Sequence, residues 1–91
     1  MYPNPKHQEL EEVEVLASKE HEIILHNDDV NTFDHVINCL IRYCDHTLEQ
    51  AEQCAYIVHY NGKCTVKTGY YDDLEPRCSS MLKANLSAEL V

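Results

Sequence analysis

The chain has 91 residues, of which 44% are hydrophobic and 25% are charged, and this is the size and composition of one small globular domain. Sixteen Asp and Glu against seven Lys and Arg give a formal net charge of −9 with His neutral. Such a charge repels a phosphate backbone and an anionic membrane surface, so we expect neither nucleic acid nor membrane as a partner. No apolar run approaches the ~20 residues that span a bilayer. The first residues lack the layout of a signal peptide, so a cytoplasmic protein is expected.

The chain contains five cysteines, an odd number without a C-x-x-C pair. In the absence of an export signal, we expect reduced thiols that pack as small apolar residues rather than a disulfide framework. These residues are Cys39, Cys44, Cys54, Cys64 and Cys78.

Residues 1–19 differ in composition from the rest of the chain. They hold two prolines and the acidic stretch Glu9–Glu14. This stretch buries little and its like charges repel, so we expect a flexible acidic N-terminal extension. The alternation of Val13 and Val15 also permits an alternative prediction, a short edge strand. The folded domain is expected over residues 20–91.

A strand and a helix are predicted at the start of this domain. Glu22–His26 is a β-branched, apolar run, and the Asn-Asp-Asp sequence at 27–29 favours a turn after it. The helix is expected to begin at Phe33, with Asn31 as its N-cap and Asp34 at N3. Its apolar residues recur at helical spacing and predict one buried face: Phe33, Val36, Ile37, Leu40, Ile41 and Cys44.

A second helix and a second strand follow. Thr47 can cap the backbone of Gln50 while the Gln50 side chain reaches back, which is a capping box. Gly62 is expected to end this helix, since glycine readily adopts the left-handed conformation. Alternation and a high content of Thr and Val predict a strand over Lys63–Thr68, ended by Gly69.

The last part of the chain predicts a third helix and a third strand. With Asp73 as N-cap, Pro76 would stand at N3, where a missing N–H costs nothing. Met81 and Leu82 would continue the apolar face, and Leu86–Leu90 would form the strand. The order β-α-α-β-α-β predicts an α+β fold, a small two-layer sandwich whose three-stranded sheet has its helices packed on one face.

Two kinds of metal site can be tested against the sequence. Asn27, Asp29 and Asn31 occupy the first three ligand positions of a calcium loop, but Thr32 replaces the glycine at position 6 and Asn38 replaces the glutamate at position 12. The calcium pattern therefore fails.

A zinc site would begin from His35 and Cys39, which are one helical turn apart, with Cys44, His46 or His59 as further ligands. This spacing permits a site without specifying one. A Cys/His nucleophile is equally unspecific, because the sequence has no nucleophile elbow and no glycine-rich phosphate loop. We expect no metal, no cofactor and no enzymatic activity, and a Cys/His metal-binding protein stays open as an alternative.

Three short segments carry a more specific combination of residues. They are His26–Phe33 followed by Val36-Ile37, then Glu49–Ala51, and then Val58–Lys63. Together they resemble the ClpS family, the adaptors of bacterial Clp proteases, from about Glu20 to the C-terminus. The N-D-D loop and the V-H-Y-x-G-K segment are weak signals singly, and their joint occurrence is specific.

The resemblance implies a non-catalytic adaptor that carries proteins with bulky hydrophobic N-terminal residues to an AAA+ unfoldase. In the family, side chains matching Asn27, Asp28 and His59 hold the free α-amino group of the substrate. Their chemistry is suitable, because an ammonium has three N–H donors and these side chains offer acceptors. The pocket for the first side chain is lined by residues matching Asn31, Phe33, Val36, Ala55 and Val58.

Two pocket positions depart from the family pattern. Phe33 stands where the family usually has a methionine that screens out β-branched residues, and Ala55 replaces another frequent methionine. Methionine adapts its shape and phenylalanine does not. We expect a re-shaped pocket that still takes Leu, Phe, Tyr or Trp. Leu86 is a candidate for the family's C-terminal pocket leucine.

The resemblance also implies a partner. The family docks on the N-terminal domain of a Clp unfoldase of ClpA or ClpC type, partly through residues matching Asp72 and Arg77. The N-terminal extension is fed toward the unfoldase pore, for which residues 1–19 look suited. A plain protein-interaction domain that uses an exposed helix face stays open as a further alternative.

Overall fold

The computed structural model describes residues 19–91, which form the elements β1, α2, α3, β2, α4 and β3 in chain order. Their bounds are Glu20–His26 (β1), Phe33–Cys44 (α2), Leu48–Asn61 (α3), Lys63–Tyr70 (β2), Tyr71–Lys83 (α4) and Ser87–Leu90 (β3). The predicted β-α-α-β-α-β order is confirmed. The N-terminal extension, with the possible strand at Val13 and Val15, falls on residues 1–18, outside the described residues. Among residues 19–91, no helix has the length and apolar character needed to cross a membrane.

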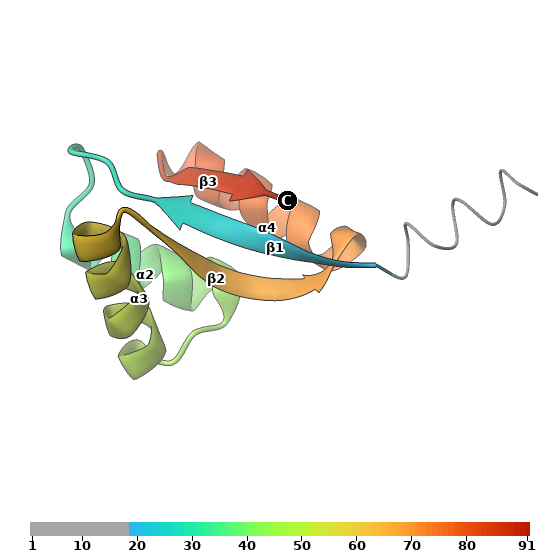
Figure 1. Ribbon diagram of the computed structural model, residues 1–91, viewed down its shortest axis with the longest axis horizontal. Helices are drawn as coiled ribbons and strands as arrows, with labels where there is room; N and C mark the ends of the chain where they lie inside the picture. Colours follow the sequence, from blue (N-terminus) through green and yellow to red (C-terminus); the bar gives the residue numbers. More distant parts are fainter. Residues whose placement is uncertain (1–18) are drawn as a thin grey trace, which may run out of the picture.

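The three strands form one antiparallel sheet in the order β2-β1-β3. Figure 1 shows β1 in the middle of the sheet, with α4 behind β1 and β3 and with α2 and α3 together near one end. The β1–β2 register shifts between Ile23 and Ile24, where Ile23 pairs with Lys67 and Ile24 with Thr65. This bulge leaves Val66 as the extra residue, and its side chain is buried in the core.

The core lies between one face of the sheet and the three helices. Alternate residues of β1 supply Ile23 and Leu25, and both are almost fully buried. Each helix adds a buried apolar stripe to the same core. The helical members are Cys39, Leu40 and Cys44 from α2, Ala51 and Val58 from α3, and Leu74, Cys78 and Met81 from α4. The predicted two-layer α+β sandwich is therefore confirmed.

The predicted cap of α2 is wrong by one residue. Thr32 is the N-cap, and its side-chain oxygen accepts a hydrogen bond from the His35 backbone N–H at 3.1 Å. The Asn31 side chain is held in another direction, because its nitrogen donates to Asp28 at 2.7 Å and to the Asn85 carbonyl at 2.8 Å. A contact between residues 54 positions apart therefore helps to orient the Asn31 side chain.

The predicted buried face of α2 is only partly right. Leu40 and Cys44 are buried and Val36 and Ile37 are half-buried, whereas Phe33 and Ile41 are exposed. Cys39 takes a place in the core instead. The helix packs against both α3 and α4, so its buried stripe is turned away from the edge that carries Phe33 and Ile41.

The two ends of α3 agree with the sequence. Thr47 and Gln50 form both bonds of a capping box, at 3.2 and 3.0 Å. At the other end, Gly62 has φ 92° and its N–H donates to the Val58 carbonyl at 2.9 Å. A side chain at that φ would be strained, so glycine is required at this turn.

The boundary between β2 and α4 was predicted wrongly. Gly69 lies inside β2, which continues to Tyr70 because Glu20 at the start of β1 pairs with it. Tyr70 then serves as the N-cap of α4 without a side-chain bond, in place of Asp73. Pro76 consequently lies inside α4 rather than at N3, and Leu82 is exposed rather than part of the buried face.

Candidate functional site, a cavity between two helices

A cavity of about 320 Å³ opens between the loop after β1 and the facing ends of α2 and α3. Its walls are apolar at the helices and polar at the loop, since the loop carries amide and carboxylate side chains. The lining residues are Leu25, His26, Asn27, Asp28, Asp29, Asn31, Thr32, Phe33, Val36, Ala55, Val58, His59 and Leu86.

The structure brings together the residues that the resemblance singles out. The three residues matched to α-amino binding, Asn27, Asp28 and His59, all line this cavity. All five residues matched to the side-chain pocket also line it, and so does the candidate Leu86. These residues come from the loop, from two helices and from the segment before β3, so tertiary structure is needed to assemble them.

Sequence reasoning missed four lining residues: Leu25, His26, Asp29 and Thr32. Their position in the sequence could have identified them, because each lies within the His26–Phe33 segment or directly next to it. His26 ends β1, and its Nε2 lies 2.8 Å from Glu89 Oε1 on β3. Since β1 and β3 pair at this point, with His26 opposite Ser87, strand register brings this pair to the rim of the cavity.

Asp28 organises the loop. One of its carboxylate oxygens accepts the backbone N–H groups of Val30 and Asn31 at 3.0 and 2.9 Å, and the other accepts Asn31 Nδ2 at 2.7 Å and Ser87 Oγ at 3.4 Å. Burial by itself raises the pKa of Asp28, but the bonds from Asn31, Val30 and Ser87 outweigh it and lower the pKa below 3.8. The carboxylate is therefore ionised at neutral pH and holds the loop in an Asx turn.

Further hydrogen bonds fix the loop and the start of α2 against the rest of the domain. The Asn27 backbone N–H donates to the Gly62 carbonyl at 2.8 Å, which joins the loop to the end of α3. His35 Nε2 lies 2.8 Å from the Ala84 carbonyl, and Asn31 Nδ2 reaches the next carbonyl, that of Asn85. Both sides of the cavity are thereby held at fixed positions.

Two of the lining side chains have free polar atoms at the rim. Within residues 19–91, neither the Asn27 side-chain amide nor the His59 ring takes part in a hydrogen bond, and both residues are exposed. An amide oxygen and a neutral imidazole nitrogen can each accept a hydrogen bond from a ligand. With the ionised Asp28 beside them, they suit a cationic group with several N–H donors.

Phe33 stands at the mouth of the cavity. It is 39% exposed, and its ring centroid lies 5.4 Å from that of Tyr56 and 5.2 Å from that of His59. Deeper in the cavity, Ala55 and Val58 are buried on α3 and Val36 is half-buried on α2. The apolar interior is thus bounded by small side chains within and by a rigid ring at its entrance.

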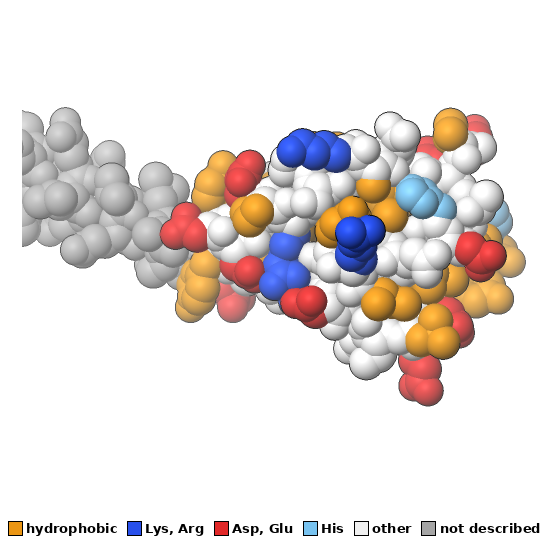
Figure 2. All heavy atoms as spheres, turned by 180° about the vertical axis from the view of Figure 1, so that it is seen from behind, with side chains coloured by type: hydrophobic (Ala, Val, Ile, Leu, Met, Phe, Trp, Pro, Cys, Tyr) orange, Lys and Arg blue, Asp and Glu red, His pale blue; other side chains and the backbone are white. Residues whose placement is uncertain are grey.

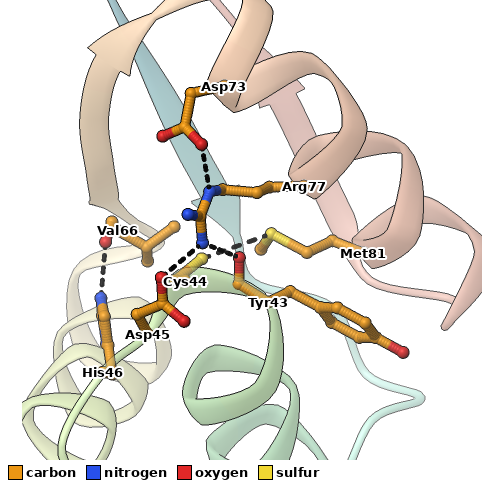
Figure 3. Close-up of polar contacts among 8 residues, drawn as sticks. All are labelled: Tyr43, Cys44, Asp45, His46, Val66, Asp73, Arg77 and Met81. Atoms are coloured by element: carbon orange, nitrogen blue, oxygen red, sulfur yellow. Dashed lines mark hydrogen bonds and ion pairs between the residues drawn. The ribbon is translucent and has the colours of Figure 1, made fainter.

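Asp72 and Arg77 lie outside the cavity and are not paired with each other. Arg77 donates from Nη1 to the Tyr43 carbonyl at 3.0 Å and to Asp45 at 2.9 Å, and from Nε to Asp73 at 3.1 Å. Figure 3 shows the Arg77 side chain reaching from α4 to the end of α2, between Asp73 and Asp45. Asp72 is exposed on the first turn of α4.

One cysteine and one histidine lie close enough to be considered for the Cys/His alternative. Cys39 Sγ lies 3.7 Å from His35 Nε2, but burial raises the pKa of Cys39, only partly offset by the charge of Arg42. A thiol nucleophile needs a lowered pKa. Burial likewise raises the pKa of Cys44 to about 11, and all five cysteines are free. In the part of the chain that the structure describes, no three His, Cys, Asp or Glu side chains are grouped so as to hold a metal ion.

The sequence matches a known family and its curated members. The family model for "ATP-dependent Clp protease adaptor protein ClpS" matches residues 17–89. A ClpS adapter protein of Thermosynechococcus vestitus is 33% identical over 86 residues, which cover 93% of this chain and 92% of that protein. One of Campylobacter jejuni strain 81-176 is 41% identical over 58 residues, or 64% of this chain, and the match spans 60% of that relative's length.

The fold also has a counterpart among solved structures. The structure of Agrobacterium tumefaciens ClpS2 bound to L-phenylalaninamide superposes with a TM-score of 0.77, covers 81% of this chain and 96% of that chain, and shares 16% identity. At that identity the likeness concerns the fold. The family match and the nearly full-length relative establish that this chain belongs to the ClpS family of adaptor proteins of ATP-dependent Clp proteases.

Proposed function

We propose that this protein binds the free N-terminus of proteins that begin with Leu, Phe, Tyr or Trp and delivers them to a Clp AAA+ unfoldase. One observation carries the proposal: the same cavity combines apolar walls on α2 and α3 with the ionised Asp28 and with the hydrogen-bond acceptors of Asn27 and His59. An N-terminal residue has the matching composition, an apolar side chain next to an ammonium group.

The ammonium group is assigned to the rim. Asn27 and His59 contact it directly, since their side chains bond to none of residues 19–91, and each such charge-assisted bond contributes roughly 1.5–3 kcal/mol. Asp28 is engaged by four internal donors, so its main roles are to hold the loop and to supply negative charge near the ammonium. A water molecule can relay its contact to the substrate.

The side chain of the first residue is assigned to the interior. A volume of about 320 Å³ is at the lower end of the ~300–1,000 Å³ typical of ligand pockets, which suits one side chain and its backbone. The rigid Phe33 ring at the entrance disfavours a side chain that branches at Cβ, as in Val or Ile. Ala55 stands where the family frequently has a methionine, and its smaller side chain leaves more room in the interior for an aromatic residue.

The expected affinity is moderate. Three charge-assisted bonds and one buried side chain give roughly 6–12 kcal/mol before the entropy of association is subtracted. A dissociation constant near the micromolar range, about −8 kcal/mol, is then close to the favourable limit. Such an affinity is appropriate for an adaptor that must release its cargo.

Fluorescence anisotropy tests this proposal. A labelled peptide that begins with Leu should bind, whereas the same peptide with an acetylated α-amine should lose binding by at least about tenfold, as expected for the loss of one or more charged bonds. A peptide that begins with Val should bind more weakly than the Leu peptide. His59→Ala should weaken the Leu peptide, and equal binding of free and acetylated peptides would exclude N-terminal recognition.

Delivery requires a second surface, which we place at the start of α4. Asp72 is exposed there, and the unfoldase N-terminal domain, of ClpA or ClpC type, is its proposed partner. Arg77 donates hydrogen bonds to Asp45 and Asp73, so its main contribution to this surface is to hold α4 in position. Asp72→Lys should reduce binding to the isolated unfoldase domain and leave the affinity for the Leu peptide unchanged.

A further inference from the structure

Two half-buried cysteines face each other where α3 packs against β2. Cys54 lies on the inner stripe of α3, one turn after Ala51 and one turn before Val58, and both of these neighbours are buried. Cys64 is the second residue of β2 and pairs in register with Leu25, whose side chain is in the core. Directly opposite residues of paired strands share one face of the sheet, so Cys64 points toward the helices. Both cysteines pack against the core.

The two thiol groups interact with each other. The Cys54 side chain forms a hydrogen bond with that of Cys64, and Cys64 Sγ also donates to the Thr65 carbonyl at 3.4 Å. Burial, and then the charge and hydrogen bond of Cys64, raise the pKa of the Cys54 thiol to about 12. A high pKa slows attack by Cys54, whereas contact with the second sulfur makes a reaction between the two intramolecular.

The other three cysteines belong to α2 and α4 and are less accessible. Each is at most 5% exposed. They are Cys39, Cys44 and Cys78. Figure 2 views the domain from the side of these two helices, where charged, polar and hydrophobic side chains form the surface. Cys44 in addition directs its Sγ to Met81 Sδ at 3.7 Å. An oxidant in solution therefore reaches the half-buried pair of α3 and β2 first.

We propose that Cys54 and Cys64 form a reversible disulfide bond that joins α3 to β2 when the protein meets a disulfide oxidant such as oxidised glutathione. Cys64 Sγ attacks one sulfur of oxidised glutathione and breaks its S–S bond, which gives a protein–glutathione mixed disulfide and one glutathione thiol. Cys54 Sγ then attacks the Cys64 sulfur and releases the second glutathione thiol. The two cysteines lose two electrons and two protons in total, and the two glutathione sulfurs gain them.

The bond closes a short loop through the turn at Gly62. A cross-link of this kind restricts the unfolded chain, so we expect the unfolding equilibrium constant to be about 30- to 100-fold smaller in the oxidised protein. α3 also carries Ala55, Val58 and His59, which line the cavity. The bond therefore holds this wall of the cavity against the sheet, whatever ligand the cavity binds.

Mass spectrometry of the full chain tests for the bond. The protein is incubated with oxidised glutathione at about pH 8.5, where more of each thiol is ionised. We expect the intact protein to lose two hydrogen atoms without retaining glutathione. Digestion with trypsin and with a protease that cuts after glutamate places the five cysteines in separate peptides. The linked peptides should contain Cys54 and Cys64.

Variants and urea unfolding test the effect of the bond. Oxidised wild type should be more stable than reduced wild type by the factor given above. Cys54→Ala and Cys64→Ala should each remove the bond, so neither should gain stability on oxidation. Cys39→Ala is the matched control, because it removes a cysteine of α2 and leaves the pair intact. It should retain both the bond and the stabilisation.

Several results would overturn the inference. It is wrong if the linked peptides contain another pair of cysteines, or if the wild type retains glutathione and forms no internal bond. Disulfide-linked dimers as the main product would show that the thiols react between copies instead. If Cys54 and Cys64 are linked but the oxidised protein is no more stable, the bond does not hold α3 to β2. Because the peptide map uses the wild type, it decides the question even if an alanine variant fails to fold.

Discussion

The cavity end of the domain and the end around Arg77 each contain a charged residue with several internal bonds, but the two ends differ in what is left free. At the cavity, Asp28 is engaged while the neighbouring Asn27 and His59 keep free polar atoms within the described residues. At the other end, Arg77 is engaged with the Tyr43 carbonyl, Asp45 and Asp73. Its bonds join α4 to the end of α2.

This difference separates residues that contact a ligand from residues that position others. A resemblance in sequence assigns Asp28, Arg77 and His59 equally to binding. The geometry divides them, because a carboxylate with four donors and a guanidinium with three bonds have less capacity for a partner than an imidazole that bonds to none of residues 19–91. The predictions below test this division, starting with the largest expected effect.

Asp28→Ala should damage both the fold and the binding site. It removes the acceptor of four hydrogen bonds, so we expect the free energy of unfolding to fall by about 2 kcal/mol and the affinity for a Leu peptide to fall by at least tenfold. Urea unfolding and anisotropy measure the two effects.

Asp28→Asn separates the turn from the charge. An asparagine oxygen can still accept the N–H groups of Val30 and Asn31, so the loop should remain in place. We expect this variant to bind the Leu peptide more tightly than Asp28→Ala but more weakly than the wild type, because the loop is kept and the negative charge near the ammonium is lost. If it binds as weakly as Asp28→Ala, Asp28 acts on the ligand through its charge alone, and the division drawn above is wrong for this residue.

Arg77→Met should affect stability alone. It removes the bonds to Asp45, Asp73 and the Tyr43 carbonyl but keeps an apolar stem, and we expect a loss of about 1–2 kcal/mol in the free energy of unfolding. The affinity for the Leu peptide should not change. Arg42→Met is the control, since Arg42 is exposed and lies 5.7 Å from the Tyr43 ring centroid. A large loss of peptide affinity in Arg77→Met alone would show that the two ends are coupled.

The two threonine caps offer a smaller and closely matched comparison. Thr32→Ala and Thr47→Ala each remove one N-cap bond and should each cost about 1 kcal/mol of stability. Thr32 lines the cavity and Thr47 does not. Only Thr32→Ala should therefore also weaken the Leu peptide, by a few-fold. Equal peptide affinities for the two variants would show that the start of α2 does not need its cap to shape the site.

Local signals in the sequence predicted most of the fold. The capping box of Thr47 and Gln50 and the left-handed Gly62 depend on neighbours in the chain, and both are confirmed. The errors arose where distant contacts decide. Asn31 and Thr32 are both good caps, and the Asn85 carbonyl helps to orient the Asn31 side chain in another direction. Gly69 stays in β2 because β1 extends opposite it.

The candidate site likewise could not be predicted where it depends on contacts between distant residues. Spacing alone left the Asn27–Asn31 loop and His59 as ordinary turn and helix-end residues, and the resemblance was needed to join them. Their gathering around one cavity depends on packing between α2 and α3. Exposure of Phe33 and its contact with Tyr56 were not predictable from periodicity, which placed Phe33 on the buried face.

The smallest expected effect is on the pH dependence of stability. The pKa of Asp28 is lowered below 3.8 in the folded state, so its ionised form is favoured by folding. Its contribution is complete well above the unfolded pKa and is lost as pH falls through the folded value. The difference in unfolding free energy between wild type and Asp28→Asn should therefore shrink between about pH 6 and about pH 3. Urea titrations at several pH values measure it. A difference that grows toward acid would mean that the hydrogen bonds from Asn31, Val30 and Ser87 do not outweigh the cost of burying the carboxylate.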